Sequence, residues 1–119
     1  MPSRAARPLL EDMQAYAKEA VELVGERSGP ELAADRMRFL AVSRAVEIIG
    51  EAASQIPEPV KAALAQIPFR QASDMRNRLI HGYGGISADI LADTVKGDLP
   101  GLVAVLEAAL AGPLPDEAP

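Results

Sequence analysis

The chain has 119 residues, a formal net charge of −5, one histidine and no cysteine. This length suits one domain with a single core; the lack of cysteine excludes disulfides, thiolate nucleophiles and thiolate zinc sites, and one histidine excludes a histidine-rich metal site. No apolar run approaches the roughly 18 residues of a membrane-spanning helix, and no apolar signal segment follows the first residues, so we expect a cytoplasmic protein without a membrane segment.

Apolar residues recur at three- and four-residue steps along the chain, and no segment alternates as a strand does. We predict a first helix over residues 9–24 and a second over residues 29–55. Ser28, Pro30 and Glu31 have the capping-box pattern that starts a helix, and Pro57 and Pro59 follow the end of the second one. Within the second helix we expect one apolar stripe made of Met37, Leu40, Ala41, Arg44, Ala45, Ile48, Ile49 and Ala52, with Gly50 marking the close approach of another helix.

The second half of the chain predicts three more helices. Residues 60–67 form a short one closed by Pro68, residues 69–80 form the next, and three glycines within residues 82–85 favour a turn. Ser87 caps the last helix, which Gly97 and Pro100 are expected to kink or split before residues 102–110. We expect the tail from residue 112 to fray and predict an all-α domain, a four- or five-helix antiparallel bundle with an ordered core over about residues 8–111.

Charge is distributed unevenly, with a basic centre and acidic ends. Between residues 36 and 78 there are seven basic residues against four acids, so this part carries 7 − 4 = +3, whereas the two ends together carry 5 − 13 = −8. Such a centre suits a localised phosphate site, although a surface with segregated charge also serves solubility or partner contact. The asymmetry alone leaves both interpretations open.

Few side chains in this sequence can transfer protons, and His81 is the clearest candidate. Its imidazole titrates near pH 6.5, and Arg76 and Arg78 stand just before it, with Tyr83 after it. A guanidinium holds two phosphate oxygens and keeps its charge, so an Arg/His pair suits cleavage of a phosphodiester. Each residue also has a purely structural interpretation. A histidine at a helix end is commonly a cap, and an arginine on a helix is commonly a solvated charge. Tyr83 could equally fill the end of the bundle with its ring.

The order of these residues resembles a known signature. The pattern resembles the motif of HepT-like toxins of the HEPN superfamily, which has an arginine, four residues, a histidine, one residue and a tyrosine. Here these are Arg76, His81 and Tyr83, and Asn77 follows the arginine as it does in that family. The segments at residues 10–13, 44–53 and 98–100 also look like landmarks of that family, in the same order, so the resemblance covers roughly residues 9–110. Gly84 and Gly85 depart from the bulkier residues usual after the tyrosine.

The resemblance implies more than the residues do. It implies an all-α dimer that cleaves RNA without a metal or other cofactor, as the toxin of a type VII-like HEPN/MNT toxin–antitoxin module. The implied antitoxin is a nucleotidyltransferase similar to MntA that silences the toxin by adding AMP to the motif tyrosine. Carried over, Arg76 and His81 are catalytic and Tyr83 is the modification site; Asn77, Arg78, Glu47 and Glu51 have supporting roles.

Helical geometry bears on the catalytic pair independently. Positions five apart on an ideal helix differ by about 140° around the axis, so Arg76 and His81 would not share a face. Either the helix distorts, or a two-fold dimer brings both copies of the pair into one cleft. Two rivals remain: an inactive HEPN-like module that only binds the nucleotidyltransferase, and a plain structural bundle in which the motif is accidental.

Overall fold

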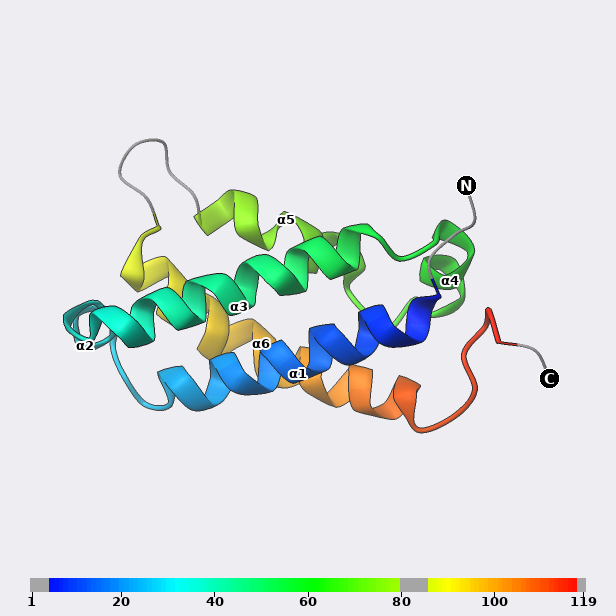
Figure 1. Cartoon of the computed structure of the whole chain (residues 1–119), viewed down its shortest axis with the longest axis horizontal. Helices are drawn as coiled ribbons and strands as arrows, with labels where there is room; N and C mark the ends of the chain where they lie inside the picture. Colours follow the sequence, from blue (N-terminus) through cyan, green and yellow to red (C-terminus); the bar gives the residue numbers. More distant parts are fainter. Residues whose placement is uncertain (1–4, 80–85, 118–119) are drawn as a thin grey trace.

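The computed structural model describes residues 5–79 and 86–117, except for the side chains of Arg76 and Leu79. Within these residues the chain forms six helices and no strand, which confirms the all-α prediction: α1 (Ala6–Val24), α2 (Gly29–Ala34), α3 (Arg36–Ser54), α4 (Glu58–Ala63), α5 (Phe69–Leu79) and α6 (Ala88–Leu110). The four longer helices form the bundle, with α1 packed against α3 and α6, and α5 along the other side of α3 (Figure 1). Each runs antiparallel to the helix it packs against, and the short α2 and α4 lie at opposite ends (Figure 1).

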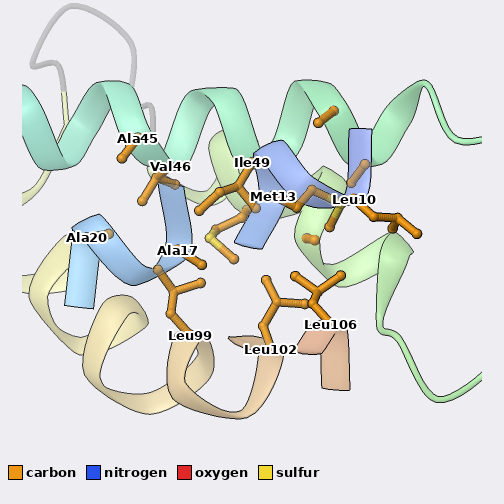
Figure 2. Packing of buried hydrophobic residues seen from close by; sticks show 14 of the residues in the cluster. Leu10, Met13, Ala17, Ala20, Ala45, Val46, Ile49, Leu99, Leu102 and Leu106 are labelled. Atoms are coloured by element: carbon orange, nitrogen blue, oxygen red, sulfur yellow. The ribbon is translucent and has the colours of Figure 1, made fainter. Parts of the chain in front are cut away.

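The core lies where α1, α3 and α6 meet. Figure 2 shows Met13 and Ala17 of α1 between Ile49 of α3 and Leu99 of α6, and each of these side chains is completely buried. Burying a leucine, isoleucine or methionine side chain contributes about 1.5–3 kcal/mol, and the alanines on α1 leave room for its neighbours to approach. Few aromatic residues are therefore needed, since the core is filled by small and branched aliphatic side chains.

The predicted second helix is in fact two helices, separated at Asp35. The capping box at Ser28 is confirmed: the Glu31 N–H donates to Ser28 Oγ (3.2 Å), and the Ser28 N–H donates to Glu31 Oε1 (3.1 Å). Beyond this short helix Asp35 has φ −102° and ψ 87°, outside the helical region, and its Oδ1 accepts from the N–H of Arg38 (3.2 Å). A short carboxylate competes well for backbone donors at a helix start. Asp35 therefore ends α2 and caps α3.

The predicted stripe on this segment is only partly right. Ala45, Ile49 and Ala52 are buried as expected, but Met37 is 84% exposed and Leu40 49% exposed. Ala41 and Arg44 are exposed as well, while Val42, Val46 and Ala53 take their place in the core. Because α3 packs against α1 on one side and α5 on the other, its buried face is broad and is rotated away from the predicted stripe.

Two differences concern the last helix and the tail. The expected split of α6 was wrong: it is one helix, with Pro100 inside it. Pro100 removes a bond to the carbonyl of Lys96, but both residues are exposed, so water can satisfy that oxygen. Residues 112–117 also differ from the frayed tail that we expected, because Leu114 is buried and the Ala6 N–H donates to Asp116 Oδ2 (3.0 Å).

The remaining boundaries shift modestly. The helix predicted over residues 60–67 begins at Glu58 and ends at Ala63, and Ser87 caps α6 by accepting from the Ile90 N–H (3.3 Å), as predicted. Gly50 is buried inside α3, which continues through it. Along residues 5–79 and 86–117, none of the helices combines the length and apolar character needed to cross a bilayer.

Candidate functional site

The last turns of α5 carry the beginning of the predicted motif. Position 76 follows Ala72 by four residues and Phe69 by seven, and both of those side chains are buried. Positions at these spacings share one side of a helix, and α5 packs along α3. Residue 76 continues the backbone of α5 after these two buried positions, and its side chain is not among those described. His81 and Tyr83 lie outside the described residues, so their roles stay predictions.

Arg78 and Asn77 occupy other sides of α5. Nη2 of Arg78 lies 3.6 Å from Oδ2 of Asp98, on α6, and both side chains are partly exposed. This ion pair connects the end of α5 with the middle of α6, which is a positioning contact. Asn77 is exposed. Of the two supporting residues predicted on α5, Arg78 therefore has a contact that holds two helices together.

Glu47 and Glu51 stand one turn apart on the outer side of α3. Glu47 Oε2 accepts from Arg44 Nη1 at 3.1 Å, and Glu51 is exposed. Among the described residues, no three carboxylate or imidazole groups gather as a cluster that could hold a metal ion. The two glutamates are thus surface groups of α3, and Glu47 is held by its own neighbour one turn back.

Sequence reasoning missed a cleft beside the predicted loop. It has a volume of about 410 Å³ and lies between α3 and the residue before the α6 cap; its lining is Arg36, Phe39, Leu40, Ser43, Arg44, Glu47 and Ile86. The guanidinium carbon of Arg36 lies 5.7 Å from the centroid of the Phe39 ring, a cation–π distance. The signal in the sequence was an arginine three residues before a phenylalanine, which we had counted only as surface charge.

The basic centre of the sequence is largely neutralised in the fold. Ion pairs join Arg38 with Asp35 (3.0 Å), Lys61 with Glu58 (3.5 Å), and, as described, Arg44 with Glu47 and Arg78 with Asp98. Within residues 5–79 and 86–117 Arg36 and Arg70 form no ion pair, and the Arg36 guanidinium lies over the Phe39 ring. Positive charge not paired with a carboxylate is therefore present at the end of the bundle where α3 begins.

Sequence comparison finds relatives that match most of the chain. A relative named "Probable ribonuclease HepT", from Thermococcus cleftensis, is 39% identical over 103 residues, covering 83% of this chain and 90% of its own length. A candidate RNase from Methanocaldococcus jannaschii is 30% identical over 100 residues, covering 84% of this chain and 86% of its own. A candidate RNase from Caldanaerobacter subterraneus is 29% identical over 99 residues, covering 83% and 88%. No solved structure gives a match.

The family model described as "Ribonuclease HepT-like" matches residues 13–109, which include most of the core, the Arg78 to Asp98 ion pair and the whole predicted motif. The chain therefore belongs to the ribonuclease HepT-like family.

Proposed function

We propose that this protein is an endoribonuclease that acts without a metal ion, with Arg76 and His81 as its catalytic residues. The observation that carries the proposal is the motif order, Arg76, Asn77, His81 and Tyr83, in a chain that belongs to a ribonuclease family. The substrate is single-stranded RNA in the cytoplasm.

The chemistry follows from the two side chains. The imidazole of His81 takes the proton of a ribose 2′-hydroxyl, and the 2′-oxygen attacks the adjacent phosphorus. The bond to the 5′-oxygen breaks as that oxygen takes a proton from the His81 imidazolium, which leaves a 2′,3′-cyclic phosphate. Arg76 stabilises the negative charge that develops on the phosphoryl oxygens. Asn77 orients the phosphate, and Arg78 positions the end of α5 through Asp98, 3.6 Å away.

A homodimer completes the site in this proposal. Arg76 and His81 are five positions apart, about 140° around an ideal helix, so two copies together bring the pair into one cleft more readily than a regular helix does. The outer side of α3 supports this assembly, because Met37 near its beginning is 84% exposed. Methionine is enriched in protein interfaces.

Regulation is proposed to occur at Tyr83, as in a type VII-like HEPN/MNT toxin–antitoxin module. An MntA-like nucleotidyltransferase transfers AMP to the tyrosine hydroxyl and releases pyrophosphate. The added phosphate is negative and lies seven residues from Arg76, so it competes with RNA for the guanidinium. Co-expression with the partner is expected to increase the mass of the Tyr83 peptide by one or more AMP units, and Tyr83→Phe is expected to prevent that increase.

The test is an RNA cleavage assay in the presence of EDTA. We expect His81→Ala to lower the cleavage rate by about 10²–10⁴-fold, with Arg76→Ala similarly impaired. If the two residues act in catalysis alone, the melting temperature of both variants should stay that of the wild type. Arg70→Ala is the matched control, since Arg70 is an exposed arginine in the first turn of α5, at the far end from the motif.

Two results would contradict this proposal. If the wild type binds a nucleotidyltransferase but cleaves no RNA, the chain is an inactive binding module. If His81→Ala or Arg76→Ala unfolds the protein instead of inactivating it, the motif is structural.

A further inference from the structure

We propose that the cleft at the beginning of α3 binds an unpaired RNA base, which stacks on the Arg36–Phe39 pair beside the scissile phosphate. This inference rests on the proposed function and deepens it, because it assigns a substrate subsite to residues outside the motif. The cleft volume of about 410 Å³ is within the range of small-ligand sites, about 300–1,000 Å³. None of the motif residues is part of its described lining.

The chemistry of the lining suits a nucleotide. Phe39 is half-buried, and the Arg36 guanidinium lies over its ring, 5.7 Å from the centroid. Proteins that recognise single-stranded RNA stack its bases on aromatic rings and on guanidinium planes. Arg36 forms no ion pair within the described residues, so its charge is available to the phosphate chain. The Ser43 hydroxyl already donates its hydrogen to the carbonyl of Phe39 (2.8 Å). Stacking on the Arg36–Phe39 pair is therefore the main contact that the cleft offers to a base.

The cleft is close to the predicted catalytic loop along the chain. Ile86, one of its walls, follows Tyr83 by three residues and His81 by five. Because a residue spans at most about 3.6 Å, a chain segment of three residues spans at most about 11 Å and one of five residues at most about 18 Å. Successive nucleotides of a single strand bridge such distances. A base in the cleft and a phosphate at the motif can therefore belong to one RNA strand.

The charge pattern favours RNA over a second protein chain in this cleft. Arg36 and Arg44 line it with a single carboxylate, Glu47, so its lining carries a net positive charge. An apolar protein surface packed there would bury Arg36 without a partner, which is costly, whereas a phosphate of RNA would pair with it. The exposed Met37 lies about 100° around α3 from Arg36 and is not part of the lining. An apolar contact through Met37 thus leaves the cleft open.

The test measures binding without cleavage. A fluorescent single-stranded 2′-O-methyl oligoribonucleotide lacks the hydroxyl that attacks phosphorus, so anisotropy reports affinity alone. Stacking on one side chain changes affinity by about 5- to 150-fold, and for a half-buried ring we expect Phe39→Leu to raise the Kd by about 5- to 10-fold. Arg36→Lys keeps the positive charge but removes the planar guanidinium, so it should raise the Kd by a similar factor. Phe39→Tyr keeps an aromatic ring and should retain the wild-type affinity.

Charge is tested separately with a matched pair. Arg36→Gln should also reduce the slope of log Kd against log salt by about 0.7, the value for one phosphate contact on a single strand. Arg70→Gln removes an equally exposed arginine far from the cleft and should change neither affinity nor slope. Melting curves check folding, and we expect the Arg36 variants to melt as the wild type does, since that side chain is exposed.

The outcomes separate this inference from the nuclease proposal. Wild-type affinity in both Phe39→Leu and Arg36→Lys would overturn the base subsite even if the protein cleaves RNA. Conversion of these variants from dimer to monomer with unchanged RNA affinity would also overturn it and assign the cleft to a second copy. Binding that depends on Phe39 in a protein that cuts no RNA would support the subsite while the nuclease proposal fails.

Discussion

Replacing Gly29 by alanine tests the close approach of α2 to the beginning of α6, directly after the predicted catalytic loop. Gly29 is the buried first residue of α2, and Asp89 is the second residue of α6. A Cβ atom at Gly29 would lie 2.7 Å from the Cα of Asp89 and 2.9 Å from its Cγ, and it would overlap with Oδ1. Rotation of the Asp89 side chain relieves the last two contacts. The clash with the Asp89 backbone remains, so one of the two helices must move.

The cost can be worked from this geometry. Overpacking that shifts backbone costs about 1–3 kcal/mol. For 119 residues, an unfolding entropy of about 2.1 cal/mol/K per residue gives about 0.25 kcal/mol/K, so each kcal/mol lowers the melting temperature by about 4 °C. We therefore expect Gly29→Ala to lower it by about 4–12 °C. Because the shift displaces the start of α6, RNA cleavage should fall below wild type even well beneath the melting temperature.

Calorimetry or a circular-dichroism melt provides the measurement, with Gly97→Ala as the matched control. Gly97 is exposed within α6, and a Cβ there meets nothing within 4 Å, so alanine should stabilise the helix by about 0.5–1 kcal/mol and raise the melting temperature. If Gly29→Ala melts at or above the wild-type temperature, the close approach of α2 to Asp89 does not exist. Full recovery in Gly29→Ala combined with Asp89→Ala would place the clash in the side chain alone.

Two further predictions concern the ends of the bundle. Arg7 donates to both carboxylate oxygens of Glu117 (2.7 and 2.8 Å) and lowers the pKa of Glu117 to about 2. Because the pKa of Glu117 in the folded protein is below its unfolded value of about 4.3, the ion pair stabilises the fold above that pH. This contribution is lost as the pH falls toward 2. Glu117→Gln should therefore reduce the loss of melting temperature that the wild type shows below pH 5. Ser28→Ala removes the side-chain acceptor of the capping box, and we expect it to cost about 1 kcal/mol, about 4 °C in a thermal melt, with Ser54→Ala as an exposed serine control.

Helix existence followed from the sequence because periodicity and caps are local. Ser28 and Ser87 begin helices because their side chains accept from backbone N–H groups that have no partner within the helix. Pro57 marks a helix boundary because proline has no backbone N–H to donate. Asp35 was missed, although aspartate is a common cap, because the apolar period continues on both sides of it. The apolar period shows that the residues on both sides of Asp35 favour a helix. It does not show that the Asp35 carboxylate ends one helix and begins another.

Burial on α3 depends on its neighbours, which the sequence does not specify. Met37 and Leu40 fit an apolar stripe with Ala45 and Ile49, yet only the latter two are buried. The phase of the buried face is set by where α1 and α5 pack, and those are contacts between segments distant in the chain. The same limit applies to the ion pair of Arg78 with Asp98, twenty positions further along the chain, which no local pattern predicts.

These misses bear on the site, because they concern tertiary contacts at one end of the bundle. The motif supplied an arginine and a histidine, but a phosphodiester also needs its flanking nucleotide held in place, and no periodicity reveals that. Arg36 and Phe39 had the ordinary pattern of a charged residue and an apolar one on a helix; their relation became visible only as a 5.7 Å contact in a cleft closed by Ile86. If that cleft holds a base, part of substrate recognition comes from α3, and variation at positions 36 and 39 should change which RNA is bound without changing how the phosphate is cut.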